Sequence, residues 1–163
     1  MDLKLKGKVA IITGGSDGIG KAAALSLSRE GARVAIAART EATLANAAKE
    51  IIDETGNEVI GIPTDVTDEA QVEALINEVV SKWGGIDILV NNAGTSSVAR
   101  LQDLSNEQMM GDIQLKVYGA IYCARHVLEH LKRSESAVII NTTTPGGKAP
   151  AAGTQPTAMS RAA

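Results

Sequence analysis

A glycine-rich segment near the start of the chain has the residue types and spacing of a phosphate-binding turn. Residues 13–20 read TGGSDGIG, directly after a β-branched run and directly before a helical pattern. In such a turn Gly14 permits the sharp bend, Gly18 lets the backbone approach a pyrophosphate, and Gly20 allows the helix to pack closely on the strand. The helix N-terminus then offers unpaired N–H groups and a partial positive charge to the phosphates. We therefore expect a dinucleotide site here, the alternative being a glycine-rich turn that binds nothing.

The end of the second predicted strand bears on which dinucleotide binds. An acidic residue about 20 positions after the glycine turn would bind the ribose 2′-hydroxyl of NAD. Here Ala38 occupies that place and Arg39 follows it, so a 2′-phosphate would meet a bidentate cation and no repelling carboxylate. The sequence therefore favours NADP and makes NAD the weaker candidate. The alternative is that Arg39 is a solvated loop charge.

The elements that must position these residues are visible as an alternation of short β-branched runs and helical patterns. The runs are KVAIIT (8–13), RVAIAA (33–38), EVIGIP (58–63), IDILV (86–90) and AVIIN (137–141). They are apolar on both faces, which is typical of a sheet covered on both sides by helices, and the segments between them are long enough to be crossovers. We therefore predict a single α/β domain over residues 1–163, a Rossmann-type, doubly wound, mostly parallel sheet with helices on both faces.

Three connecting segments carry helix signals. Apolar residues recur at helical spacing in the segment 68–85, with Thr67 expected as the N-cap and Asp68 and Glu69 in the first turn. A longer helix is expected from Ser105, which forms a capping-box pattern with Gln108, to about residue 133. A last helix begins at Pro156, and it would need about 10 more residues to cover its side of the sheet. We therefore expect these residues to be part of a longer chain, and the alternative is a complete five-stranded domain with a frayed tail.

Composition restricts the partners and the location. The chain has 16 basic and 19 acidic residues and no basic run longer than two, which argues against nucleic-acid and membrane surfaces. It lacks the apolar run of a signal peptide and any stretch approaching the roughly 20 residues of a membrane span, so we expect a cytoplasmic protein. Cys123 is alone, which excludes an internal disulfide and a cysteine-based metal cluster. His126 and His130 are expected on a solvated helix face and not as metal ligands.

The spacing G-x-x-x-G-x-G, together with two further motifs, resembles the short-chain dehydrogenase/reductase family from about residue 6 to the end. Asp65, in TDVTD, follows the third strand, where the family's aspartate contacts the adenine, and residues 91–94 (NNAG) follow the fourth, where the family lines the cofactor cleft. Asp17 lies where NADP-binding members often carry a basic residue, which counts against NADP. Compared with the family's roughly 250 residues, the C-terminal strands and the substrate loop are missing. The resemblance implies these cofactor-binding residues: Gly14, Ser16, Asp17, Gly18, Ile19, Gly20, Arg39, Thr40, Asp65, Val66, Asn92, Ala93 and Gly94.

The same resemblance implies catalytic positions, and the chain departs from the family at each of them. The family uses an asparagine on the long helix, a serine after the fifth strand, and a tyrosine followed four residues later by a lysine. Thr157 and Arg161 occupy the tyrosine and lysine positions, and Thr144 occupies the serine position. Lys116 occupies the asparagine position, or Gln114 if the register slips.

Loss of the tyrosine removes the family's proton donor. An aliphatic hydroxyl is far less acidic than a phenol of pKa about 10, and Arg161 keeps its charge but does not deprotonate. Lys116 is the best replacement by type, since burial and a neighbouring cation favour release of its proton. Our hypothesis is that Lys116 acts as general acid while Thr144 and Thr157 orient a carbonyl. The alternative is that Lys116 extends from the helix to solvent.

Two functions follow from these motifs. The first is an NADP-dependent oxidoreductase that transfers hydride between nicotinamide and a small carbonyl or alcohol substrate, with an altered proton donor. The second is a catalytically silent dinucleotide-binding protein: a sensor, a scaffold or a partner subunit. The polar replacements, among them the like-charged Arg161, favour the enzyme. The resemblance also implies a homodimer or homotetramer formed through the long helix.

Overall fold

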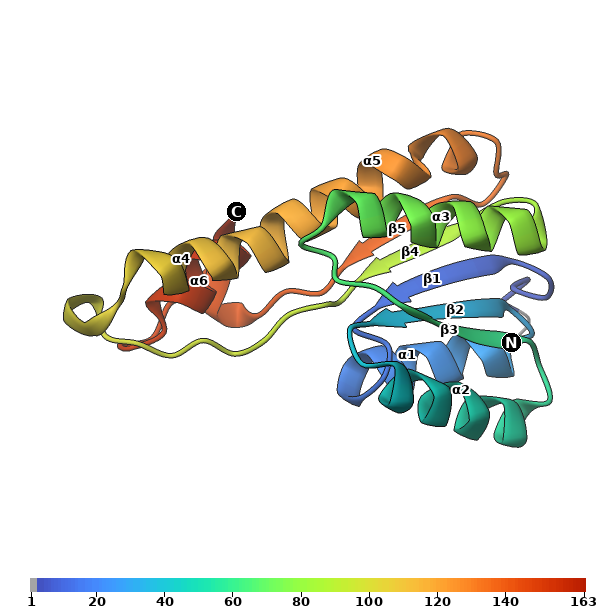
Figure 1. Ribbon diagram of the computed structural model, residues 1–163, viewed down its shortest axis with the longest axis horizontal. Coiled ribbons are helices and arrows are strands. Elements are labelled where there is room, and N and C mark those ends of the chain that lie inside the picture. Colours follow the sequence, from blue (N-terminus) through green and yellow to red (C-terminus); the bar gives the residue numbers. More distant parts are fainter. Residues whose placement is uncertain (1–2) are drawn as a thin grey trace.

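Five parallel strands form the centre of the structure, a computed structural model that describes residues 3–163 (Figure 1). The strands are β1 (Val9–Thr13), β2 (Arg33–Ala38), β3 (Val59–Pro63), β4 (Ile88–Asn91) and β5 (Val138–Asn141), in the sheet order β3-β2-β1-β4-β5. The α-helices are α1 (Gly18–Arg29), α2 (Glu41–Thr55), α3 (Glu69–Trp83), α4 (Asn106–Ile113), α5 (Gly119–Leu131) and α6 (Gln155–Ala162). The five predicted strands and the doubly wound parallel architecture are therefore confirmed.

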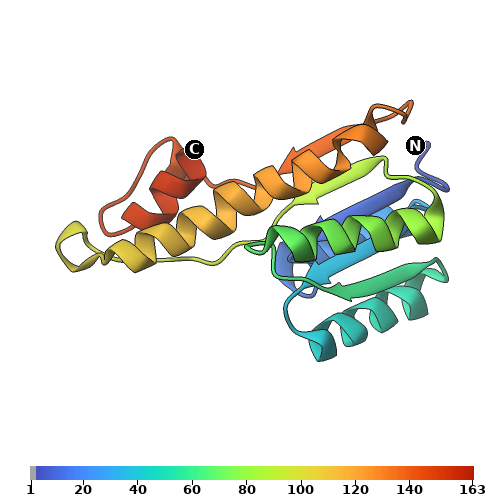
Figure 2. The ribbon, with the colours of Figure 1, turned by 45° about the horizontal axis from the view of Figure 1, so that its top comes forward.

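Helices cover both faces of the sheet, with α1 and α2 on one side and α3 and α5 on the other (Figures 1 and 2). Because successive strand residues point to opposite faces, each of the strands β1 to β4 contributes to two cores. Ile11 packs with Val72 of α3 and Val127 of α5, whereas Ile12 packs with Ala24 of α1 and Leu44 of α2. All six residues are fully or almost fully buried.

The edge strand β5 differs from the expected pattern of a strand buried on both faces. It pairs with β4, and Val138, Ile139 and Ile140 remain 44%, 40% and 48% exposed. Among the described residues, α5 contacts β5, whereas α6, which follows β5 in the chain, packs against α4. The apolar residues of β5 are thus less covered than those of the central strands.

The helix ends show which local signals were correct. The predicted capping box is confirmed: Gln108 N donates to Ser105 Oγ at 3.2 Å, and Ser105 N donates to Gln108 Oε1 at 3.1 Å. The predicted N-cap of α3 is wrong, because Asp68 accepts from the first-turn N–H groups instead of Thr67. The Thr67 hydroxyl donates to Asp65 Oδ1 at 2.8 Å, which removes it from the helix end.

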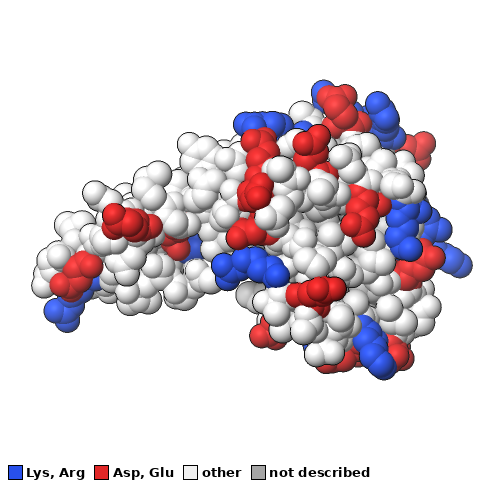
Figure 3. Space-filling view, viewed as in Figure 1, with Lys and Arg blue, Asp and Glu red and all other residues white. Residues whose placement is uncertain are grey.

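The long helix after β4 is interrupted and extends beyond the sheet. A π-helical turn, Gln114–Tyr118, joins α4 to α5, and short 3₁₀ turns lie at Leu101–Asp103 and Pro145–Gly147. Beyond the carboxyl ends of the strands, α4 and α6 pack side by side (Figures 1 and 2). On the face shown in Figure 3, acidic and basic side chains are mixed over the sheet and its helices, while this extension carries few charges. The candidate functional residues lie where the extension meets the sheet.

Candidate active site

The glycine turn joins β1 to α1 with two residues in the left-handed region. Gly14 has φ +65° and Gly18 has φ +53°, conformations that side chains disfavour. Asp17 is the N-cap of α1 and accepts from Gly18 N at 2.7 Å. A Cβ on Gly20 would overlap the Gly14 carbonyl oxygen and lie 2.5 Å from Asn92 Nδ2, so the helix start and the turn pack backbone to backbone. This is the geometry of a glycine turn that can place a phosphate at the N-terminus of α1.

Asn92 and Thr13 fasten the end of β4 to this turn. Asn92 Nδ2 donates to the carbonyl oxygens of Thr13 and Gly14 at 3.1 and 3.2 Å. The Thr13 hydroxyl accepts from the N–H groups of Asn92 and Ala93 at 3.0 and 3.1 Å. Asn92 therefore braces the turn, although the resemblance implied a contact with cofactor. Thr13 was missed, and its position as the last polar residue of β1 was the available signal.

One pocket is lined by six of the thirteen predicted cofactor residues. It has a volume of about 150 Å³ and lies between the ends of β1, β2, β3 and β4. Its lining includes Gly14, Arg39, Asp65, Val66, Ala93 and Gly94. Arg39 is exposed, and within residues 3–163 no carboxylate is paired with it, so its guanidinium is available to an anion. The glycine turn and this pocket together fit the phosphates and ribose of a dinucleotide.

The other predicted cofactor residues lie outside this pocket. Ser16, Asp17, Gly18 and Ile19 lie at the start of α1, and Ile19 is 70% exposed. Thr40 is at the N-cap position of α2, but its side chain makes no capping hydrogen bond. Apart from Thr40, the predicted residues therefore fall into two groups: the α1 turn, to which Asn92 is hydrogen-bonded, and the pocket.

Lys116 is buried and paired. It lies in the π-helical turn with its side chain 1% exposed, and its Nζ donates to Asp112 Oδ1 at 2.7 Å and to Oδ2 at 2.6 Å. A third bond runs to Thr157 Oγ1 at 3.1 Å. The alternative expectation that Lys116 reaches solvent is wrong, because Asp112, four residues earlier, compensates its charge inside the protein. Sequence reasoning missed Asp112, although its i, i+4 spacing from Lys116 was a usable signal.

Thr157 connects this pair to the loop that follows β4. Its hydroxyl accepts from Ser97 N at 2.9 Å and donates to Ser97 O at 3.0 Å, in addition to accepting from Lys116. A hydroxyl has one donor and two acceptor sites, so all three are in use. In this arrangement Thr157 ties the loop to α6 and has no free site for a carbonyl.

Ser160 and Arg161 complete the cluster from the same helix. Ser160 Oγ donates to Asp112 Oδ2 at 2.6 Å, which links α6 to α4. Arg161 Nη1 donates to the Thr142 carbonyl oxygen, and its Nε is buried with no hydrogen-bond partner among residues 3–163. Burial lowers the pKa of Arg161, and the charge of Asp112 opposes this shift. The site thus holds two cations and one carboxylate.

Gly94 is the point at which the cofactor pocket meets this cluster. A Cβ added there would overlap Arg161 Nη2 and lie 3.5 Å from Lys116 Cε. Thr144 is exposed and lies on a neighbouring cavity of about 340 Å³, which Ser97 and Thr157 also line. The structure therefore brings Lys116, Thr157 and Arg161 together and places Thr144 on the adjacent cavity.

The remaining candidates lie away from the cluster. Gln114, the alternative candidate for the asparagine position, donates from Nε2 to Thr67 O at 3.2 Å, so its side chain lies toward the start of α3 and away from the cluster. Burial raises the pKa of the Cys123 thiol to about 12, consistent with a packed, unreactive side chain. His126 Nε2 lies 3.4 Å from Glu69 Oε1. Within residues 3–163 there is no group of three or more His, Cys, Asp or Glu side chains that could hold a metal ion.

None of the helices within residues 3–163 is long and apolar enough to cross a membrane.

The parallel sheet, the glycine turn and the pocket at the carboxyl ends of the strands define a Rossmann-type dinucleotide-binding protein. Comparison with known proteins gives its family. The chain belongs to the short chain dehydrogenase family, whose model matches residues 8–163. General stress protein 39 of Bacillus subtilis (strain 168) is 36% identical over 141 residues, which cover 86% of this chain and 49% of that protein. The chain thus spans about half the length of the curated relatives it matches.

Solved structures of the family agree with this fold. L-Sorbose reductase from Gluconobacter frateurii, complexed with NADPH and L-sorbose, superposes with a TM-score of 0.96 at 33% identity, covering 99% of this chain and 62% of that one. A short chain oxidoreductase from Pseudomonas aeruginosa PAO1, with bound NADPH and an atypical catalytic center, gives 0.92 at 31% identity, covering 95% and 61%. These two structures hold NADPH, and that of a xylitol dehydrogenase, which also matches, holds NAD⁺.

Proposed function

We propose that the protein is an NADP-dependent oxidoreductase that interconverts a small carbonyl compound and its alcohol, with Lys116 in place of the missing tyrosine as proton donor. The observation that carries this proposal is the meeting of Lys116, Thr157 and Arg161 beside Gly94, at the edge of the cofactor pocket. A charged donor at that point stands next to the place where a nicotinamide-dependent reaction would occur.

The residues that would hold the cofactor are those of the turn and the pocket. The N–H groups at the start of α1 would bind the phosphates, Arg39 the 2′-phosphate and Asp65 the adenine side. Arg161 keeps the positive charge of the family's lysine and would hold ribose hydroxyls. A bound nicotinamide would supply or accept the hydride.

The part of this chain in the chemistry is to stabilise and protonate the carbonyl oxygen. The two cations and the single carboxylate leave a net positive charge, which favours negative charge developing on that oxygen. The Lys116 ammonium donates a proton to the oxygen, and the amine that remains regains a proton from water. Thr157 holds the loop at Ser97 over the cavity, and Thr144 supplies a hydroxyl at its wall.

A second candidate is a dinucleotide-binding protein without turnover. The observation that favours it is that all three hydrogens of the Lys116 ammonium and the whole Thr157 hydroxyl are used by protein groups. Turnover would require a substrate oxygen to displace one of these bonds. The two candidate functions share the cofactor site. They differ in whether a substrate oxygen can displace one of the hydrogen bonds of Lys116 or Thr157.

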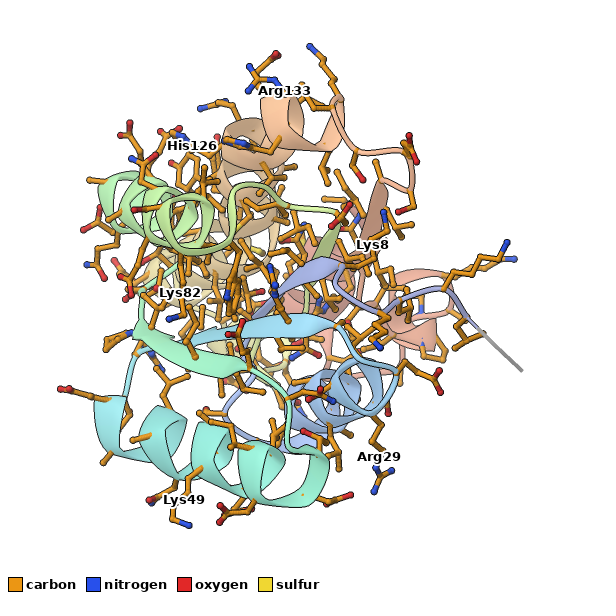
Figure 4. All side chains as sticks on the ribbon, turned by 90° about the vertical axis from the view of Figure 1, so that its right-hand side faces the viewer. Lys8, Arg29, Lys49, Lys82, His126 and Arg133 are labelled. Carbon is orange, nitrogen blue, oxygen red and sulfur yellow. The ribbon has the colours of Figure 1, made fainter. Side chains whose placement is uncertain are left out.

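Cofactor choice is tested by titrating NADPH and NADH against the purified protein and following nucleotide fluorescence. Arg39→Asp is expected to weaken NADPH binding about 10- to 100-fold, because it removes a charge-assisted hydrogen bond and adds a repelling carboxylate. Arg133→Asp makes the same charge change just after α5, far from the pocket (Figure 4), and is expected to leave binding unchanged. Equal effects of the two variants would contradict the role of Arg39.

Turnover is tested with NADPH and a panel of ketones and aldehydes. The oxidoreductase predicts NADPH oxidation with at least one of them, and a loss of about 100-fold or more in kcat for Lys116→Met, in the range expected for general acid catalysis. Tight NADPH binding without oxidation would favour the second candidate. Wild-type turnover in Lys116→Met would exclude Lys116 as proton donor.

We also propose that the protein forms a homodimer or homotetramer through the long helix. Tyr118, Ile121 and Leu128 are 43%, 42% and 45% exposed along one stretch of helix, and such apolar surface favours association. Sedimentation of the protein and of Ile121→Glu measures this. A monomer in both samples would overturn the proposal.

A further inference from the structure

The buried carboxylate of Asp112 is a titratable group that the proposed reaction does not use. Its side chain is 3% exposed, and it contacts Lys116 through both oxygens and Ser160 through Oδ2. An exposed ion pair contributes little, and a buried one is often replaceable by apolar residues without loss of stability. Stability alone therefore does not explain why a carboxylate lies next to the ammonium of Lys116, and we look for a role of Asp112 in the function of Lys116.

We infer that Asp112, braced by Ser160, is the positioning residue that keeps Lys116 charged and aimed at the cleft beside Gly94. This inference rests on the proposed function, because it assigns Lys116 the part of proton donor. Ser160 lies on α6, so its bond to Asp112 fixes α4 and Lys116 relative to the two other members of the cluster, Thr157 and Arg161.

The charges around Lys116 explain why a carboxylate is needed. The charged groups that face its ammonium are Asp112, from its own helical segment, and Arg161, from α6, whose Nη2 lies beside the same Gly94 position. The loop after β4 contributes neutral groups, with Ser97 reaching Lys116 through Thr157. Burial and the neighbouring Arg161 both disfavour a positive charge on Lys116, and the negative charge of Asp112 opposes these two effects.

Ser160 also lets the ammonium exchange partners. Each of the three N–H groups of Lys116 has a protein acceptor, so a substrate oxygen must displace one of them. When Lys116 turns away from Asp112 Oδ2, that oxygen keeps its hydrogen bond from Ser160. When it turns away from Thr157, that hydroxyl keeps both bonds to Ser97. Neither exchange leaves a buried carboxylate oxygen or hydroxyl unpaired, which keeps the cost of opening low.

The test compares Asp112→Asn and Ser160→Ala with a matched control, Asp87→Asn. Asp87 also contacts a lysine and a serine, Lys8 and Ser134, but it precedes β4 at the opposite end of the sheet. Asp112→Asn is expected to lower kcat about 100-fold with KM and NADPH binding within about twofold of wild type. The alkaline limb of its rate–pH profile is expected to move to lower pH, because the ammonium has lost the neighbouring negative charge.

The companion variants separate positioning from folding. Ser160→Ala keeps the carboxylate and is expected to lower kcat about 3- to 10-fold without moving the alkaline limb, since a single hydrogen bond is lost. Asp87→Asn is expected to leave both kcat and the pH profile unchanged. Wild-type kcat and an unmoved limb in Asp112→Asn, in a protein that needs Lys116, would overturn the inference.

A spectroscopic measurement keeps the inference testable if the wild type proves inactive. In protein labelled with ¹⁵N-lysine, a buried ammonium that exchanges slowly with water gives a signal at a pH where exposed lysines give none. The Lys116 signal, assigned by its loss in Lys116→Met, is expected to disappear in Asp112→Asn. An inactive wild type in which Asp112 controls this signal would refute the oxidoreductase and leave the holding role intact. A signal unchanged in Asp112→Asn would overturn the holding role.

Discussion

Replacing Lys116 with methionine removes half of a buried ion pair, and its effect on stability can be worked out from the structure. The side chains of Lys116 and Asp112 are 1% and 3% exposed, and the ammonium binds both carboxylate oxygens. In the variant the carboxylate keeps the bond from Ser160, and stranding a buried charge costs about 3–5 kcal/mol. For a chain of this size each kcal/mol lowers Tm by about 2–4 °C, so Lys116→Met is expected to melt roughly 6–20 °C below wild type.

Thermal unfolding followed by circular dichroism at pH 7 measures this change, with two companion variants. The double variant Asp112→Leu/Lys116→Met removes both charges and is expected to recover most of the loss, because an apolar pair is often neutral or stabilising. Lys49→Met is the matched control: Lys49 and Asp53 have the same i, i+4 spacing but lie on the exposed side of α2 (Figure 4). Its Tm is expected to equal that of wild type within error.

Two results would refute this reasoning. Equal, small shifts in Lys116→Met and Lys49→Met would show that burial adds nothing to the pair. A double variant as unstable as Lys116→Met alone would show that the loss comes from packing and not from the stranded carboxylate.

Three further predictions concern the rest of the domain. Because burial raises the pKa of Cys123 to about 12, a thiol reagent at pH 8 is expected to react only on unfolding, and rapid reaction of the native protein would contradict this. Burial by itself raises the pKa of Asp87, but hydrogen bonds led by that from Ser134 outweigh it and hold the pKa below 3.8. The contribution of Asp87 to stability is therefore present above about pH 4 and is lost as the pH falls through the folded pKa. In urea unfolding between about pH 5 and 2, the stability of Asp87→Asn should fall less with decreasing pH than that of wild type. The same pH dependence of stability in both proteins would exclude this contribution. Gly20→Ala forces a Cβ onto the Gly14 carbonyl and is expected to cost about 1–3 kcal/mol in urea unfolding, so a wild-type midpoint would show that the turn can relax.

Local sequence signals predicted the elements well, because they depend on neighbours along the chain. The five strands and the Ser105/Gln108 capping box needed nothing more than β-branched runs and a three-residue spacing. The N-cap of α3 failed because Thr67 and Asp68 are both good caps, and the choice was made by Asp65, whose carboxylate takes the Thr67 hydroxyl. A competing partner two residues away was enough to change the outcome.

The sequence by itself determined the class of site. The glycine spacing at 13–20 predicts a backbone that approaches a phosphate, and Arg39, after a strand without an acidic end, predicts a cation near it. These properties depend on residue type and on position within one strand–turn–helix unit. They were readable because the N–H groups of an anion site at a helix N-terminus come from that strand–turn–helix unit itself.

What only the tertiary structure decided is the state of the replaced catalytic residues. Lys116 looked equally able to reach solvent or to lie buried beside a cation, and in this structure its side chain is buried against the Asp112 carboxylate, because α6 packs on α4. That packing brings Thr157 and Ser160 to the Asp112–Lys116 pair across 41 and 48 residues of chain and leaves both side chains of the pair buried. An i, i+4 ion pair on a helix surface contributes little to stability, whereas the buried pair of Asp112 and Lys116 holds the lysine in one position. This burial arises from the packing of α6 on α4, and no single stretch of sequence predicts it.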